Sequence, residues 1–241
     1  MNSIPQSHAI PHHPPLRQQW MQGALRALPV MLGYVTVGFA YGVMAQEAGL
    51  SLFNGVLMSV IVYAGSAQLI GAGMFGAGAH PFAIIFTTFI VNLRHLLMSA
   101  AISPHLKGWN KTELTLFGLE LTDETFALHS SSFAVESPTK TSLFASNLFS
   151  QLAWVAGSLL GMLAGSLIGD IRPFGLDFVL PAMFAALIFM QLKNRRQLLI
   201  ALLAGGISML LLGLGMTQWN VILATLAAAT VGAVLETWKR D

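Results

Sequence analysis

Three short polar motifs interrupt long apolar stretches of this sequence, and the first is Tyr63-Ala-Gly-Ser-Ala-Gln68. Polar side chains within an apolar span cost free energy and need partners, so they mark functional sites by default. Ser66 and Gln68 offer neutral donors and acceptors that suit the ammonium and carboxylate groups of an amino acid. Gly65 and the glycines after it would let the helix loosen and expose carbonyl groups. Hydrogen bonding between helices explains the same residues equally well.

The second motif, Asn92-Leu-Arg94-His95, adds a cation and a titratable group. His95 is a candidate proton carrier because an unperturbed histidine titrates near neutral pH. In a continuous helix, Asn92 and His95 share a face at a spacing of three, whereas Arg94 points away from them. Arg94 can meet a substrate carboxylate, or it can serve only as the cationic partner of an acidic residue.

The third motif, Gly118-Leu-Glu120-Leu-Thr-Asp123-Glu124, supplies carboxylates. At spacings of three and four, Glu120, Asp123 and Glu124 would share one helical face, where like charges repel unless a cation lies nearby. Arg94 is the obvious counter-ion. An ion pair that forms and breaks beside His95 could couple proton movement to transport. A static pair that only fixes the fold fits the same residues.

The elements that position these motifs are predicted to be membrane-spanning helices. Hydrophobic residues make up 55% of the 241 residues and charged residues only 9%, against roughly 25% charged in a typical soluble chain. The mean hydropathy of +0.68 agrees. Without cysteine, the chain has no disulfide scaffold, thiolate metal site or Cys nucleophile. A formal net charge of +2 is too small for nucleic-acid binding.

Long stretches without Asp, Glu, Lys or Arg set the positions of the helices, because a bilayer core needs about 20 apolar residues. We expect an all-α, polytopic membrane bundle with seven spans, at about residues 27–46, 53–74, 81–102, 142–169, 177–192, 197–214 and 219–237. Residues 112–134 are helical and partly apolar, but their acidic residues are costly in lipid. They form an eighth span facing the bundle interior, a re-entrant helix or an interfacial helix.

Basic residues predict the orientation, because they concentrate on the cytoplasmic side. The basic residues that precede the sixth span and follow the seventh place both sites in the cytoplasm. If residues 112–134 cross the membrane, Arg17 and Arg26 are cytoplasmic too. If they do not cross, Lys107 and Lys111 are cytoplasmic instead.

Glycines indicate how the helices associate. They recur every four residues in two predicted spans, at Gly38 and Gly42 and at Gly157, Gly161, Gly165 and Gly169. Such stripes mark tight helix crossings in lipid, here either within the chain or with another subunit. The segments that begin at Tyr34 and Trp154 also share a glycine-spaced helix, a Gly-Leu pair and a following Phe, which is a weak internal repeat. Seven spans would invert the second copy, and eight would make the copies parallel.

In this order and at these separations, the three motifs and the later Leu180-Pro181-Ala-Met-Phe184 resemble the AzlC family of branched-chain amino acid exporters. The resemblance extends from about Ala24 to the C-terminus. It implies a multi-pass permease subunit of the bacterial cytoplasmic (inner) membrane that exports valine, leucine, isoleucine and sometimes methionine. It also implies a small AzlD-type membrane partner. We expect no cofactor. Many relatives read Gly-Leu-Thr-Asp-Glu at the third motif, so Glu120 is an addition without a role carried over.

The domain organisation follows from the same division of the sequence. Residues 1–22, rich in Pro, His and Gln, are predicted to form a disordered tail, and residues 23–241 the transmembrane permease domain.

The resulting hypothesis is proton-driven export through a site lined by the second and third spans and closed by the acidic segment. The predicted substrate-binding residues are Tyr63, Gly65, Ser66, Gln68, Asn92 and Arg94. The predicted proton-coupling or ion-pair residues are Arg94, His95, Glu120, Asp123 and Glu124.

Two other classes of protein fit less well. A channel could be built from glycine-rich broken helices, but no repeated filter-like segment is present. An enzyme is disfavoured, because the sequence has no nucleophile elbow, phosphate loop, zinc motif or dinucleotide fingerprint.

Overall fold

The computed structural model describes residues 14–167, 194–216 and 220–237, with a few isolated positions between 168 and 193. These residues form helices and no strand, and they fall into two compact units, within residues 1–180 and 181–241. The α-helices of the first unit are α1 (Leu16–Glu47), α2 (Leu52–Ile61), α3 (Gly65–Gly76), α4 (Pro81–Asn92), α5 (Arg94–Ile102), α6 (Lys111–Leu119), α7 (Asp123–Val135) and α8 (Lys140–Gly165). The second unit has α10 (Arg195–Gly213) and α11 (Asn220–Thr237).

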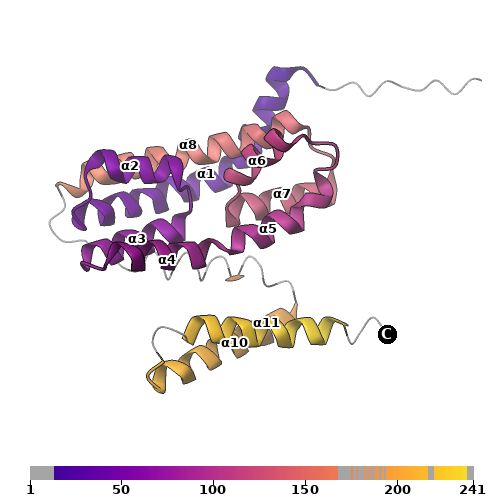
Figure 1. Ribbon diagram of the computed structural model, residues 1–241. Helices are drawn as coiled ribbons and strands as arrows, with labels where there is room; N and C mark the ends of the chain where they lie inside the picture. The colour runs from indigo at the N-terminus through magenta and orange to yellow at the C-terminus, as the bar shows by residue number, and fades with distance from the viewer. Residues whose placement is uncertain are drawn as a thin grey trace, which may run out of the picture. The chain divides into compact units, whose positions relative to one another are not determined.

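Helices α1 and α8 form the central pair of the first unit, and they run in the same direction (Figure 1). Gly23 faces Ser142 where both helices begin, and Gly165 faces Gln46 where both end. We call these two ends of the pair the amino end and the carboxyl end. A Cβ atom on Gly157 would lie 2.5 Å from a backbone carbonyl oxygen of α1, so the two backbones touch. The glycine stripe is therefore an intramolecular contact.

Helices α2 and α3 form a hairpin that enters from the carboxyl end and returns to it, which we call the carboxyl-end hairpin. The Ser51 side chain caps α2 just after α1 ends. At the end of α3, a Cβ on Gly76 would lie 3.0 Å from that of Ala48. The turn between the two helices lies halfway along the central pair, where Gly65 contacts Trp154. The prediction of one continuous span over residues 53–74 was therefore wrong.

Helices α4 and α5 cross back from the carboxyl end to the amino end, interrupted only at Leu93. Gly71 of α3 packs beside Thr88 of α4, whereas the end of α5 packs with Leu106 and Leu143 near the amino end. The stretch Pro81–His105 is long and apolar enough to span a membrane, which agrees with the span predicted over 81–102.

Helices α6 and α7 form a second hairpin, which enters from the amino end and is called the amino-end hairpin. Glu113 in the first turn of α6 pairs with Lys140 of α8 at 2.7 Å, and Glu136 after α7 pairs with Arg26 of α1. The turn at residues 120–122 reaches Tyr34, near the middle of α1. Of the three alternatives for residues 112–134, the re-entrant one matches these contacts.

The amino-end hairpin reverses because two capping signals divide it into two helices. Asn110 and Glu113 form a capping box at the start of α6, and Thr122 and Thr125 form another at the start of α7. Glu120 caps the end of α6, and Asp123 begins α7. The prediction that the two residues share one continuous helical face was therefore wrong.

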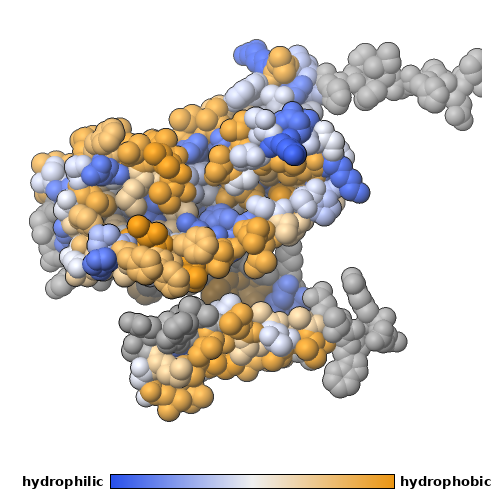
Figure 2. All heavy atoms as spheres, in the orientation of Figure 1, coloured by the Kyte–Doolittle hydropathy of each residue, from blue (hydrophilic) through white to orange (hydrophobic). Residues whose placement is uncertain are grey.

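The two hairpins thus enter from opposite ends and stop midway along the central pair (Figure 1). Hydrophobic residues cover much of the face around α2, α3 and α4, and hydrophilic residues gather toward the end where α6 lies (Figure 2).

Other predictions are met in part. Helix α1 begins at Leu16, so residues 16–22 are helical rather than part of a disordered tail, and residues 1–13 lie outside the described residues. The predicted span at 177–192 also lies outside them. Within the second unit, α10 and α11 agree with the predicted spans at 197–214 and 219–237, and Gly232 packs against Ile200.

The count of seven or eight spans is not confirmed. Among the described residues, four stretches are long and apolar enough to cross a membrane: Leu16–Glu47, Pro81–His105, Lys140–Gly165 and Arg195–Gly213. The parallel direction of α1 and α8 matches parallel repeat copies. This parallel direction needs no eighth span. Neither hairpin crosses, so α4–α5 is the one crossing element between α1 and α8 among the described residues.

Candidate functional site

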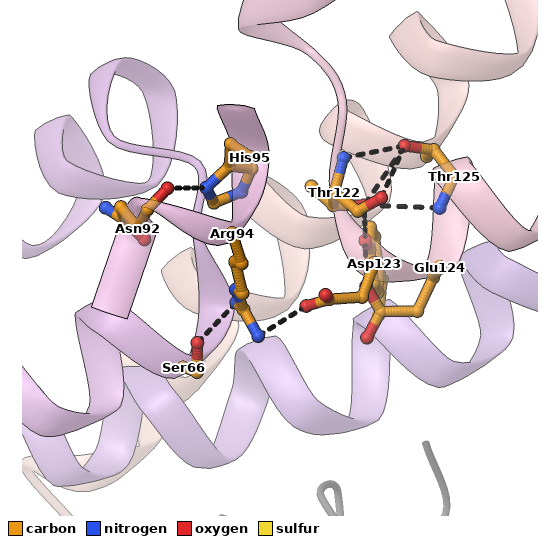
Figure 3. A network of polar contacts seen from close by, with 9 residues as sticks. Ser66, Asn92, Arg94, His95, Thr122, Asp123, Glu124 and Thr125 are labelled. Atoms are coloured by element: carbon orange, nitrogen blue, oxygen red, sulfur yellow. Dashed lines mark hydrogen bonds and ion pairs between the residues drawn. The ribbon is translucent and has the colours of Figure 1, made fainter. Parts of the chain in front are cut away.

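Arg94 lies where the two hairpin turns meet the interrupted α4–α5 span (Figure 3). Its Nη1 forms an ion pair with Oδ2 of Asp123 at 2.7 Å, and its Nη2 donates a hydrogen bond to Oγ of Ser66. Ser66 lies in the first turn of α3, and Asp123 is the first residue of α7. The expected ion pair is present, with Asp123 as the partner, and its side chains are only 25% and 16% exposed.

The turn of the carboxyl-end hairpin is held in an unusual backbone conformation. Tyr63 has a φ of 40°, a left-handed value rare for a residue with a bulky side chain. Such conformations persist only where the surroundings enforce them, and they cluster at functional sites. Gly65 then starts α3 against the ring of Trp154, where a Cβ would lie 2.9 Å from a ring carbon. The requirement for glycine here is steric.

Glu124 lies beside the ion pair but has a different partner. Its Oε2 accepts a hydrogen bond from the Tyr34 hydroxyl at 2.8 Å, and that hydroxyl also contacts Thr122 Oγ1. The ring of Tyr34 packs edge-on against Tyr63 and Trp154. A carboxylate next to aromatic rings is an arrangement that attracts a cationic group.

Gln68 is fully buried, and its amide is already paired within the protein. Its Nε2 donates to Ser59 Oγ at 3.0 Å, and its Oε1 accepts from Trp154 Nε1 at 3.0 Å. Ser59 in turn donates to Ser158 of α8 at 2.7 Å. The geometry thus corresponds to the interhelical alternative for Gln68, which fastens the carboxyl-end hairpin to the central pair.

Asn92 and His95 lie on either side of the α4–α5 interruption. Nδ1 of His95 lies 3.0 Å from the backbone oxygen of Asn92, and the ring is partly buried (Figure 3). Among the described residues, no hydrogen bond or ion pair joins His95 to an acidic side chain, and Asp123 is paired with Arg94 instead.

Glu120, which follows α6, lies beside Asn147 of α8 rather than beside Arg94. His129 Nε2 lies 2.6 Å from Oδ1 of Asn147, and both side chains are buried. One oxygen of Glu120 is buried without a hydrogen-bond partner. The structure therefore separates Glu120 from the Arg94–Asp123 pair.

Several buried polar atoms around these turns lack a partner. In the described part of the chain they are Tyr63 Oη, Asn92 Oδ1, Arg94 Nε, Glu120 Oε2 and Asn147 Nδ2. Buried polar groups are almost always paired, so such a group points to a ligand, a water molecule or a proton. Three of the five belong to residues predicted to bind substrate.

Sequence reasoning missed Tyr34, Trp154 and Asn147. Tyr34 precedes Gly38 by four residues, so it shares the face of α1 that meets α8. Trp154 precedes Gly157, the first glycine of the stripe in α8, by three residues, so it lies on the face of α8 that meets α1. A polar aromatic residue in line with a small-residue stripe is the signal that could have identified both. Asn147 offered no comparable signal.

Metal ligation has no support among the residues that the structure describes, since no cluster of three His, Asp or Glu side chains is found there.

An apolar helical shell around a partly buried ion pair between broken helices defines a multi-pass membrane protein with a polar site near its middle. The family model for the AzlC protein matches residues 29–168, which is more than half of the chain. The chain belongs to the AzlC family.

Named relatives agree with this assignment. The chain is 30% identical over 213 residues to the branched-chain amino acid transport protein AzlC of Bacillus subtilis, covering 86% of this chain and 82% of that protein. It is 26% identical over 231 residues to the inner membrane protein YgaZ of Escherichia coli, covering 93% and 92%. An uncharacterized membrane protein of Archaeoglobus fulgidus is 32% identical over 222 residues, with 91% and 95% covered. No solved structure matches the chain. The chain is a multi-pass bacterial membrane protein with a transport role.

Proposed function

We propose that this protein exports branched-chain amino acids (valine, leucine and isoleucine, and also methionine) across the cytoplasmic membrane, driven by the proton gradient. The observation that carries the proposal is the Arg94–Asp123 ion pair, which lies between two helix turns and an interrupted span. Transporters commonly bind substrate at such discontinuous helices near the bilayer midplane. A relative of similar length is named for branched-chain amino acid transport.

The two ends of an amino acid have complementary partners in this site. Arg94 carries an unpartnered Nε and would receive the carboxylate, because guanidinium groups bind carboxylates through two adjacent N–H groups. Glu124, beside the rings of Tyr34 and Tyr63, would receive the ammonium group. Asn92 and the Tyr63 hydroxyl offer further buried polar atoms. Gln68 would position the hairpin rather than touch substrate.

Proton coupling is assigned to the same region. Of the three carboxyl groups of Glu120, Asp123 and Glu124, only that of Asp123 is paired with the Arg94 guanidinium, and Glu124 accepts a hydrogen bond from Tyr34. A buried carboxylate without a cation is costly, so one of these groups would carry a proton when no substrate ammonium is present. His95 is the alternative carrier.

The partner remains the one that the family resemblance implies, a small AzlD-type membrane subunit. The deciding experiment is counterflow of labelled valine in proteoliposomes that contain the chain together with this subunit. Saturable counterflow that responds to an imposed pH gradient is expected. No saturable counterflow would refute the exporter, and conductance that follows the Nernst potential would favour a channel. Arg94→Gln is the matched inactive control.

A further inference from the structure

Arg94 contacts both hairpins at once, and in each hairpin its partner lies in the first turn of the second helix. Ser66 lies in the first turn of the half-helix that leads away from the turn of the carboxyl-end hairpin. Asp123 lies in the first turn of the half-helix that leads away from the turn of the amino-end hairpin. One side chain therefore holds the tips of two elements that enter from opposite ends of the central pair (Figure 3).

Charge assigns a side of the membrane to each hairpin. Apart from Arg94, the Lys and Arg residues that the structure describes in the first unit lie toward its amino end, near the first turns of α1, α6 and α8: Arg17, Arg26, Lys107, Lys111 and Lys140. The carboxyl end carries Glu47, and residues 48–93 contain no Lys or Arg. By the positive-inside rule, the amino end faces the cytoplasm. Because the 53–74 segment does not cross, Arg17 and Arg26 lie at the same end as Lys107 and Lys111. Both predicted alternatives had placed these two pairs on opposite sides.

We propose that Arg94 is a shared latch of two gates: the carboxyl-end hairpin closes the site toward the outside through Ser66, and the amino-end hairpin closes it toward the cytoplasm through Asp123. The inference rests on the proposed function, and it adds an exchange at Arg94. The substrate carboxylate replaces the carboxylate of Asp123, which frees the cytoplasmic gate.

The exchange is electrostatically balanced. Asp123 is replaced by another carboxylate, so the guanidinium is never left without a counter-ion in a partly buried position. Ser66 is a neutral partner, so its bond to Arg94 can persist while the carboxylates exchange. The outer gate then stays closed while the inner gate is open, which is what alternating access requires.

Cysteine reactivity tests the latch, and the natural chain contains no cysteine. Leu121→Cys reports on the tip of the inner gate and Ala64→Cys on the tip of the outer gate, and each of these positions is 2% exposed. Asp123→Ala should raise the reactivity of Leu121→Cys several-fold toward a membrane-impermeant maleimide applied from the cytoplasmic side of inverted vesicles. It should leave Ala64→Cys unchanged from the outside. Ser66→Ala should give the converse pattern.

Exposed sites serve as controls for folding. Ala77→Cys and Thr112→Cys lie at the bases of the two hairpins, and their labelling should not change in either variant. Increases at both tips in both variants, or at neither tip, would overturn the latch.

The substrate arm tests the exchange itself. Valine should raise the reactivity of Leu121→Cys, and valinamide, which has no carboxylate, should not. Equal effects of the two would overturn the exchange. Because the labelling requires no net transport, a chain with the expected pattern in the two alanine variants but no valine counterflow would keep the latch and lose the proposed function.

Discussion

At the scale of single residues, Arg94 and Gln68 were both predicted to bind substrate, but their hydrogen-bonding partners in the structure differ. Arg94 retains an unpartnered Nε at the hairpin turns, whereas the amide of Gln68 is bonded on both sides within the protein. Availability for a ligand therefore depends on which donors and acceptors remain free, and only the three-dimensional arrangement supplies that information.

Reversal of the ion pair gives the first prediction. Arg94→Asp alone places two carboxylates together and should abolish counterflow, because breaking an ion pair costs up to about 3–5 kcal/mol when it is fully buried and this pair is partly buried. Adding Asp123→Arg should restore folded protein and part of the activity, as measured by valine counterflow. Adding Glu124→Arg instead should not, since Glu124 bonds to Tyr34. Equal rescue by both partners would contradict the observed pairing.

Gln68 gives the second prediction. Gln68→Leu should destabilise the protein by about 1–3 kcal/mol, because it leaves the Trp154 indole N–H buried without a partner. The KM for valine should stay nearly constant while the midpoint of thermal unfolding in detergent falls. A large rise in KM at unchanged stability would restore Gln68 as a substrate contact.

At the scale of helices, close packing between α1 and α8 supports the two hairpins of the first unit. The turns of both hairpins rest against this pair, at Trp154 and at Tyr34. The central pair is held by backbone contact at glycines, so a single methyl group should be enough to disturb it.

The third prediction compares two glycines in helices. Gly157→Ala should destabilise the protein by about 1–3 kcal/mol, because the new Cβ would collide with the backbone of α1. The matched control is Gly73→Ala, which has nothing within 4 Å and should be neutral or slightly stabilising. Thermal unfolding in detergent, monitored by size-exclusion chromatography, measures both. Equal effects would argue against direct contact of α1 and α8.

The sequence allowed prediction of the helices but not of how the chain reverses between them. Periodicity and missing charge located α4–α5 and α8 within a few residues, and they located the end of α1 but not its start at Leu16. The apolar run at 53–74 was long enough to cross, and only the left-handed backbone at Tyr63 and the packing of Gly65 on Trp154 turn it back. These causes are tertiary, so hydropathy does not detect them. The Arg94–Asp123 pair was predictable because so few charges lie inside the apolar stretches.

At the scale of the whole molecule, two re-entrant hairpins change the expected topology. Each hairpin returns to the end from which it entered, so the first unit has three crossing elements among its described residues: α1, α4–α5 and α8. Four crossing elements were predicted up to residue 169, or five if residues 112–134 crossed. Apart from Arg94, the Lys and Arg residues described in this bundle therefore lie toward one end. A continuous second span would have divided them between the two ends.

Labelling from each side of the membrane gives the fourth prediction. Glu47→Cys and Ala77→Cys flank the carboxyl-end hairpin and should both react from outside intact cells. Thr112→Cys and Ser137→Cys flank the amino-end hairpin and should react only after permeabilisation. A continuous span over 53–74 would instead place positions 47 and 77 on opposite sides.

The order of elements has a consequence for the direction of flow. A crossing element followed by a hairpin occurs twice, first as α1 with α2–α3 and then, running the opposite way, as α4–α5 with α6–α7. The backbone elements that reach Arg94 from the two ends of the central pair are thus equivalent, and the side chains that contact it, Ser66 and Asp123, are not. For the proposed transporter, any difference between inward and outward movement would then come from these two side chains and from the electrochemical gradients, rather than from the order of helices.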